Sequence, residues 1–380
     1  MTAAAVAAPI VARTFGPARL AHVLVFALGL ALAYLLGPSV LPSAFIAVLL
    51  WSFATSPAGR ALSLILPFAF RLLLAVGAFQ FEPPVQIVDL MVRGVDPLRL
   101  VAQQDIWWAR YLVAYPAILM TDHWGMRFTD AFALYSAALL PVTALVLLGS
   151  VRVWRRLAEL EAFFVGIGIA LVIVAIATQM NGRLIAAHIG MAMILLAQSR
   201  MITASRLGPR EAALLALGMV LSHMTSGTGL VAFATLIAGL ALTYALGIDR
   251  VRTLTILWVI SVIFAPLLYR DMLKNVDFYG GGVAAVITML DHGPGTFLRH
   301  SPLVAAVAVA GAVAVVVVLW RSRRRILSLP RALWPAALSV PVTSIGGLYG
   351  YSTLTMGLPP LIILATSAAI AWSDRRRRSA

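Results

Sequence analysis

The chain has 380 residues, of which 62% are hydrophobic and only 11% are charged. A water-soluble protein of this length could not bury so much apolar surface, which excludes a soluble enzyme or binding module. The formal net charge of +15 is compatible with nucleic-acid binding, but in a membrane protein it more often reflects basic cytoplasmic loops. Cysteine is absent, which excludes disulfide bonds and metal sites with cysteine ligands.

Apolar stretches that approach the roughly 20 residues of a membrane-spanning helix recur along the whole chain. We predict twelve spans, at 20–36, 40–56, 59–77, 130–150, 162–180, 182–200, 211–225, 228–247, 251–269, 302–320, 332–348 and 352–372. Long apolar runs are typical of helices, whereas the strands of a membrane barrel alternate over about ten residues. We therefore expect an all-α polytopic integral membrane protein that forms one membrane domain over residues 1–380.

Basic residues assign an orientation to these spans. The 29 Lys and Arg residues divide into 20 on one side, eight on the other, and Arg71 inside a span. By the positive-inside rule the basic side is cytoplasmic, and it includes the terminal tails 1–19 and 373–380. This explains the charge without a nucleic-acid partner. Nine of the 14 acidic residues and five of the six histidines fall on the opposite, periplasmic side, where we expect the chemistry.

The loop 78–129, between the third and fourth spans, is predicted to be periplasmic. Its segment VQIVDLMVRGVDPLRLVA predicts a short amphipathic helix interrupted at Gly94 and Pro97. The following DIWWARYLVAYPAIL has aromatic residues suited to the membrane interface. The loop either positions a lipid-linked head group and its sugars or is an interfacial helix with solvated charges. Its candidate residues are Asp96, Arg99, Asp105, Trp107, Arg110 and Tyr111.

The second predicted periplasmic loop, 270–301, also contains short helical and glycine-rich segments. It begins with Arg270 and contains Lys274, the only lysine. Gly280–Gly282 has the composition of a hinge, so a mobile flap is one interpretation. Aspartate and histidine occur here, but no spacing resembles an established metal site. We expect neither a metal nor another cofactor.

Arg71, Arg183 and His188 are candidate site residues inside predicted spans. Arg71 is inside 59–77, where an unpaired arginine costs at least about 2.5 kcal/mol on insertion scales. Arg183 and His188 lie in the outer half of 182–200. The planar guanidinium of arginine suits a diphosphate, and a neutral histidine can accept a proton from a hydroxyl. The alternatives are an arginine solvated at the membrane surface and a histidine bonded to a neighbouring helix.

The segment LSHMTSGTG, 221–229, joins the seventh and eighth predicted spans. Its small residues can end a helix and expose backbone amides that bind anions. His223 and Ser226 are the candidate site residues here. A plain tight turn is the alternative.

These segments resemble bacterial polysaccharide polymerases of the Wzy/EpsG type. The resemblance rests on NGRLIAAHIGMAMILLAQSR and LLALGMVLSHMTSGTGLVAF, with Arg183, Arg200 and the stretch 223–226 at the matching positions. FAFRLLLAVG is similar to the arginine-containing segment that precedes the first outer loop in that family, which assigns Arg71. The family often has Gly-x-Asp followed by aromatic residues there, whereas Gly77 is followed by AFQF. The acid of the first loop is therefore not matched.

The resemblance implies a metal-independent glycosyltransferase of the bacterial inner membrane with a GT-C-like architecture. It would polymerise repeat units linked to undecaprenyl diphosphate into exopolysaccharide or O-antigen on the periplasmic face. Lipid-linked donor and acceptor glycans and membrane lipid are the expected partners, and chain-length regulators and export proteins are further candidates. Diphosphate binding is expected at Arg71, Arg183 and Arg270. His188, His223, Asp96 and Asp105 are candidate general bases.

Four other functions remain open. A glycosyltransferase that uses a polyprenyl monophosphate sugar would need an acid in the outer loop, such as Asp96 or Asp105. An O-antigen ligase has the same donor as a polymerase, but its large periplasmic loop usually lies later in the chain. A transporter or flippase of lipid-linked sugars should have charges at mid-membrane depth on one pathway, which only Arg71 partly satisfies. A non-catalytic assembly subunit would tolerate substitution of all these residues.

Overall fold

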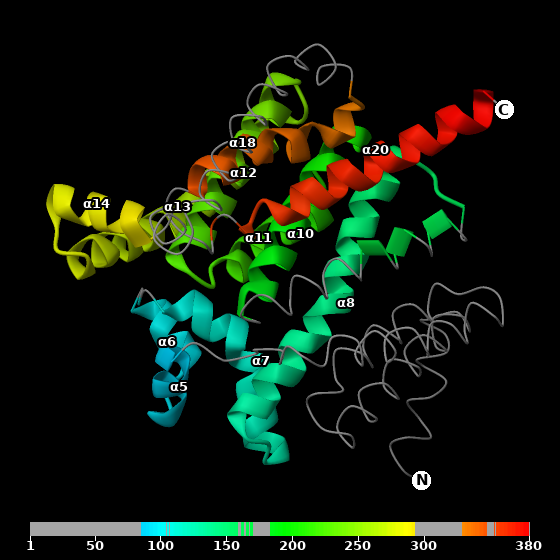
Figure 1. Ribbon diagram of the computed structural model, residues 1–380. Helices are drawn as coiled ribbons and strands as arrows, with labels where there is room; N and C mark the ends of the chain where they lie inside the picture. The colour runs from blue at the N-terminus through cyan, green and yellow to red at the C-terminus, as the bar shows by residue number, and fades with distance from the viewer. Residues whose placement is uncertain are drawn as a thin grey trace, which may run out of the picture. The chain divides into compact units, whose positions relative to one another are not determined.

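The computed structural model describes residues 85–103, 105, 107–158, 161–162, 165–166, 168–169, 183–292, 329–347, 353 and 355–379. These ranges form twelve helices and no strand (Figure 1). Among the described helices, three are long and apolar enough to cross a membrane, over Leu184–Ala204, Gly227–Ala245 and Arg250–Asp277. The chain is therefore a helical, multi-pass membrane protein. The predicted spans 20–36, 40–56, 59–77 and 302–320, and most of 162–180, lie outside the described residues.

The described residues fall into two compact units. One contains 116–145 and the few residues after 157, and the other contains 85–115, 146–156 and 183–379. Two helices run through both units, α7 (Trp108–Trp124) and α8 (Phe128–Trp154). In the first unit, Arg127 pairs with Asp130 at the start of α8, with Nε and Oδ2 2.9 Å apart. The second unit contains the three candidate spans and all the residues of the site described below.

The core of the second unit is a helical hairpin of α10 (Arg183–Ala204) and α11 (Pro209–Ser222). Their backbones approach so closely at Gly190 that an added Cβ would lie 2.5 Å from the carbonyl oxygen of Gly218. Small residues allow this kind of contact between membrane helices. At the other end of the hairpin, Glu211 accepts hydrogen bonds from Arg200 Nε at 2.9 Å and from the Gly208 N–H at 3.2 Å.

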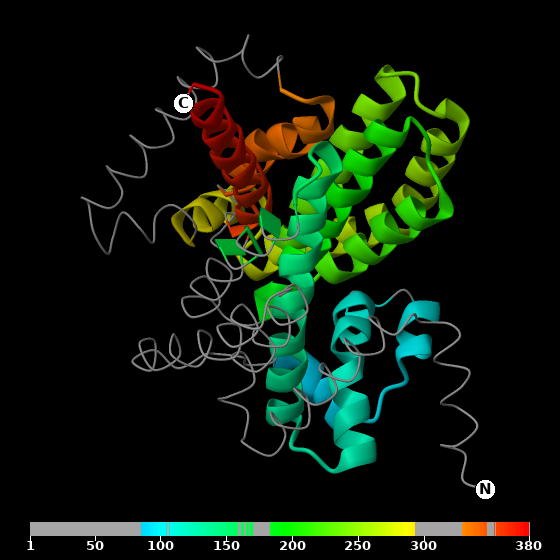
Figure 2. The ribbon, with the colours of Figure 1, turned by 90° about the vertical axis from the view of Figure 1, so that its right-hand side faces the viewer.

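Helix α12 (Ser226–Ala245) packs against α10 and α11, and the three lie side by side in both ribbon views (Figures 1 and 2). Thr225 caps its N-terminus, where its hydroxyl oxygen accepts the Thr228 N–H at 3.1 Å. The Gln198 amide crosses from α10 and donates to the carbonyl oxygens of Thr235 and Leu236, at 3.3 and 3.2 Å. Gly239 leaves the space for this amide, so a buried polar contact fixes the α10–α12 crossing.

Helix α13 (Arg250–Phe278) is longer than the span predicted at 251–269. Its 29 residues correspond to about 43 Å, against a hydrocarbon core of about 30 Å. Gly280, Gly281 and Gly282 follow with φ of 96°, 76° and 52°. Glycine adopts this left-handed conformation without steric cost, which allows the chain to turn into α14 (Gly282–His292). The break between α13 and α14 lies at the glycines predicted as a hinge.

The first predicted loop contains the helices that its sequence indicates. The amphipathic segment forms α5 (Val85–Val92) and α6 (Pro97–Ala102), which confirms the predicted interruption. Gly94 has a φ of 60°, and the Asp96 carboxylate accepts the Leu98 N–H at 2.9 Å at the start of α6. Helix α7 then begins at Trp108 and contains the aromatic segment.

The remaining helices lie near the C-terminus and complete the second unit. They are η2 (Arg331–Leu333), α18 (Trp334–Gly346) and α20 (Leu358–Ser379), which occupy the spans predicted at 332–348 and 352–372. Helix α18 packs on α12, and α20 packs on α18 and α10. The end of α8 joins α20 through a hydrogen bond from Trp154 Nε1 to Ser367 Oγ at 3.0 Å. An ion pair between Arg155 and Asp374 lies on the same two segments.

Candidate functional site

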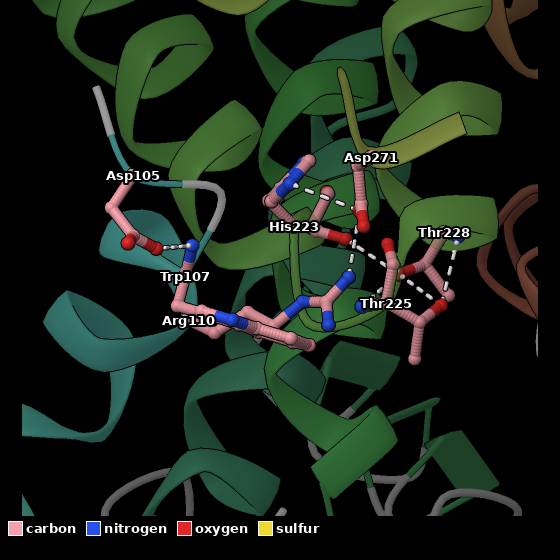
Figure 3. A network of polar contacts seen from close by, with 8 residues as sticks. Asp105, Trp107, Arg110, His223, Thr225, Thr228 and Asp271 are labelled. Carbon is pink, nitrogen blue, oxygen red and sulfur yellow. Dashed lines mark hydrogen bonds and ion pairs between the residues drawn. The ribbon is translucent and has the colours of Figure 1, made fainter. Parts of the chain in front are cut away.

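A cluster of polar side chains lies where three parts of the second unit meet. These parts are the turn that leads into α7, the turn between α11 and α12, and the last turns of α13 (Figure 3). We call it the charged cluster; its members are Asp105, Trp107, Arg110, His223, Asp271 and Lys274.

The centre of the charged cluster is a buried ion pair between α7 and α13. Arg110 and Asp271 are 8% and 2% exposed, and Arg110 Nη2 lies 2.7 Å from Asp271 Oδ2. Trp108 packs on Phe264 with ring centroids 5.9 Å apart, which joins the same two helices. Two buried charges at this distance compensate each other's loss of hydration, whereas either one alone would be costly.

His223 lies beside the same carboxylate oxygen. It caps α11, where its N–H donates to the Val220 carbonyl at 3.1 Å, and the residue is 0% exposed. Its Nε2 lies 3.7 Å from Asp271 Oδ2. Its Nδ1 faces Gly229, since a Cβ added there would lie 2.3 Å from that nitrogen. Neither ring nitrogen has a hydrogen-bond partner among the described residues, so the imidazole is enclosed but not bonded.

The accessible edge of the charged cluster is formed by Trp107, Lys274 and Asp105. The centroid of the Trp107 ring lies 3.7 Å from Lys274 Nζ and 4.6 Å from Arg110 Cζ. The Asp105 carboxylate accepts the Trp107 N–H at 2.8 Å and is close enough for its charge to act on Lys274. Lys274 is exposed, and Asp105 and Trp107 are half-buried. The edge therefore presents an ammonium, a carboxylate and an indole together.

The charges of the cluster nearly cancel. Arg110 and Lys274 are cations and Asp105 and Asp271 are anions, while His223 is charged only if protonated. In a site of low dielectric constant such a balance is less costly than an excess of one sign. A ligand phosphate would therefore meet cations that already have partners, and at least one of them must change partner to bind it.

Two other predicted catalytic residues have structural contacts elsewhere. His188 is 7% exposed in α10, with Nε2 3.2 Å from the Thr355 hydroxyl oxygen. Asp96 is exposed and accepts the backbone hydrogen bond that begins α6. Asp105 and His223 are thus the two predicted bases that belong to the charged cluster.

The predicted phosphate-binding and sugar-binding residues lie in several places. Arg71 is outside the described residues, and Arg183 and Ser226 begin α10 and α12 with their side chains outside the described part. Arg99 and Arg270 are exposed. Tyr111 is buried and contacts Tyr115, with ring centroids 6.4 Å apart. Trp107 and Arg110 belong to the charged cluster. Among the described residues, no three His, Asp or Glu side chains group as metal ligands.

The sequence alone assigns no specific role to Asp271 or Lys274. Both residues follow the span predicted at 251–269, which ends where the first charged residues begin. The signal that the helix continues was present, since no glycine or proline occurs from Tyr269 to Tyr279. On a helix extended through this segment, Asp271 and Lys274 share one face.

Comparison with known proteins adds no assignment to this geometry. No protein-family model matches the chain, and neither a curated protein nor a solved structure does.

Proposed function

We propose that this chain is a membrane glycosyltransferase that polymerises glycan repeat units carried on undecaprenyl diphosphate. The observation that carries the proposal is the charged cluster at the end of α13. It combines a buried Arg110–Asp271 pair, an enclosed His223 and an accessible edge of Lys274, Trp107 and Asp105. Such a cluster at the end of a candidate membrane span suits a substrate with a lipid tail and a charged, sugar-bearing head.

The proposed reaction requires two kinds of side chain. A hydroxyl of the acceptor glycan forms a new bond to the anomeric carbon of the donor, whose bond to the diphosphate oxygen breaks. The electron pair of that bond leaves with the polyprenyl diphosphate, so negative charge grows there. Cations such as Arg110 and Lys274 stabilise this charge. The proton of the attacking hydroxyl must pass to a base.

Asp105 is the base that the geometry supports best. A substrate hydroxyl can reach its half-buried carboxylate, which accepts the Trp107 N–H at 2.8 Å and whose charge acts on Lys274. His223 has no exposed surface, and its two nitrogens face Gly229 and Asp271. We assign His223 a positioning role, in which it packs against Asp271 and so fixes the carboxylate that holds Arg110.

A second candidate is a glycosyltransferase that uses a polyprenyl monophosphate sugar. The position of Asp105 favours it, because such an enzyme needs an acid from the first outer loop as its base. The monophosphate carries less charge than a diphosphate, which fits a cluster with balanced charges. The two candidates differ in the step at which glycan synthesis would stop.

Glycan length in the cell tests the proposal. The gene would be replaced by Asp105→Asn, the protein quantified in the membrane, and lipid-linked and exported polysaccharide separated on a gel. Asp89→Asn is a matched control, because Asp89 is an exposed acid on α5 that pairs with Arg93 at 2.7 Å. The control should retain long polymer.

Three results are distinguishable in this experiment. Loss of long polymer with single repeat units retained would support the polymerase. Loss of the single unit as well would favour the transferase that uses a monophosphate sugar. A ladder unchanged from the parent strain, with the variant present in the membrane, would overturn both.

A further inference from the structure

Lys274 differs from all the other basic residues of the chain. It is the only lysine among 29 basic residues, the other 28 being arginines. It follows Asp271 by three residues on α13, so both side chains extend from one face of the helix. Asp271 is buried whereas Lys274 is exposed. The last turns of α13 thus carry a buried anion with an accessible cation beside it.

The two cations of the charged cluster have different partners. The Arg110 guanidinium is bound to the Asp271 carboxylate at 2.7 Å. The Lys274 ammonium lies 3.7 Å from the centroid of the Trp107 ring, and among the described residues it forms no ion pair with a carboxylate. Asp105 and Asp271 act on it only through their charge. Lys274 is therefore the cation that can change partner without breaking an ion pair.

The chemistry of lysine suits such a change. Its ammonium is a compact charge on a flexible four-carbon stem, and it binds phosphate as a point charge. Attraction to the face of an indole is weaker than a charge-assisted hydrogen bond to a phosphate oxygen. A phosphate at the edge of the cluster would therefore compete successfully with Trp107 for the ammonium, while Arg110 stays bound to Asp271.

We propose that Lys274 is the phosphate-binding residue of the charged cluster and that Trp107 holds it when no ligand is bound. The ligand class is a lipid-linked phosphate; that it carries a glycan rests on the proposed function. A prenyl diphosphate and the head group of an anionic phospholipid both present phosphate oxygens at a membrane surface. The experiment must therefore separate these two sources.

Because the chain has one lysine, amine acetylation reports on this residue alone among the side chains. The full-length protein, purified in detergent, would be treated with an amine-acetylating reagent, and Lys274 acetylation followed by mass spectrometry. A lysine-containing peptide in the same tube controls for reagent consumption. The probes are farnesyl diphosphate, farnesol as its phosphate-free match, and phosphatidylglycerol. We expect farnesyl diphosphate to slow acetylation at least threefold and farnesol to leave it unchanged.

The different probes distinguish a prenyl diphosphate from a phospholipid as the ligand, and a Trp107 variant tests the role of that residue. Protection by phosphatidylglycerol equal to that by farnesyl diphosphate would keep the phosphate site and assign it to phospholipid. Unchanged acetylation with both phosphate probes would overturn the proposal. Trp107→Leu should raise acetylation in the absence of ligand and keep protection by farnesyl diphosphate; unchanged basal acetylation would refute the contact with Trp107. Protection of Lys274 together with normal polymer in the Asp105→Asn strain would support the phosphate site and reject the polymerase.

Discussion

Helices α10 and α13 are both candidate membrane spans, but their polar residues serve different purposes. In the apolar window of α10, 89% of residues are buried inside the protein, against 28% in α13. The polar side chains of α10 contact the helices around it: Gln198 binds carbonyls of α12, and His188 contacts Thr355. Helix α13 leaves apolar residues such as Trp258 and Val262 exposed, which suits contact with lipid. Its Asp271 and Lys274 belong to the charged cluster.

This difference follows from where each helix lies. A central helix is surrounded by protein, so its buried polar groups must form hydrogen bonds with neighbouring helices. These bonds fix how the helices cross. A peripheral helix faces lipid over most of its length, and only its end reaches water, where a head group can be bound. Polar residues in the middle of α10 are therefore expected to govern stability, and those at the end of α13 to govern activity as well.

The largest effect on stability is expected from breaking the buried ion pair. Asp271→Leu would remove the carboxylate that pairs with the buried Arg110 guanidinium, and breaking a buried ion pair costs about 3–5 kcal/mol of unfolding free energy. The double variant Arg110→Met/Asp271→Leu should recover most of that loss, because two apolar side chains then replace two charges. Neither variant should make long polymer. Unfolding in a graded series of detergent mixtures measures the first effect, and the glycan gel measures the second.

The double variant separates folding from chemistry. If Asp271→Leu is as stable as the parent protein, the Arg110–Asp271 ion pair is hydrated. A stable double variant that still makes long polymer would remove Arg110 and Asp271 from the proposed mechanism.

The next effect concerns packing in the centre of the molecule. Gly190→Ala would place a Cβ 2.5 Å from the Gly218 carbonyl oxygen and 2.6 Å from the Ser222 backbone nitrogen. Backbone atoms cannot turn away as a side chain does, so α10 and α11 must separate, at a cost of about 1–3 kcal/mol. The unfolding midpoint should fall while the protein that remains folded keeps the proposed polymer-forming activity.

Gly149→Ala is the matched control for this packing effect. Its added Cβ would lie 3.6 Å from the methyl groups of Leu196, an ordinary contact also made with α10. Alanine is a better helix former than glycine by about 1 kcal/mol, so stability should stay unchanged or rise. Equal losses in Gly190→Ala and Gly149→Ala would mean that the close crossing at Gly190 does not determine stability.

Features of the fold that depend on nearby residues could be predicted from the sequence. The interruption between α5 and α6 depends on Gly94 and Pro97, whose backbone preferences act locally, so it was predicted correctly. Helix α13 ends at Phe278, nine residues beyond the predicted end of the span at 269, because charged residues can end a span without ending its helix. A helix can continue past the membrane surface, where charges are solvated.

The charged cluster required information that local patterns do not contain. Arg110 and Asp271 are 161 residues apart, and nothing near either residue specifies the other. Asp105, Trp107, Arg110 and His223 were each singled out by type, but their meeting with Asp271 and Lys274 depends on how α7 packs on α13. The enclosure of His223 by Gly229 likewise depends on the turn into α12.

The smallest effect tests whether the histidine of α10 is structural or chemical. Thr355→Val removes the hydroxyl that lies 3.2 Å from His188 Nε2, and a hydrogen bond of this kind is worth about 1 kcal/mol. If His188 only joins α10 to the segment before α20, the unfolding midpoint should fall slightly and polymer length should not change. If His188 accepts a proton during transfer, the lost hydroxyl should alter its orientation and shorten the polymer by more than the loss of stability explains. Measuring both quantities in Thr355→Val therefore places His188 with Gln198, as a packing residue of the central helix, or adds it to the chemistry proposed for the end of α13.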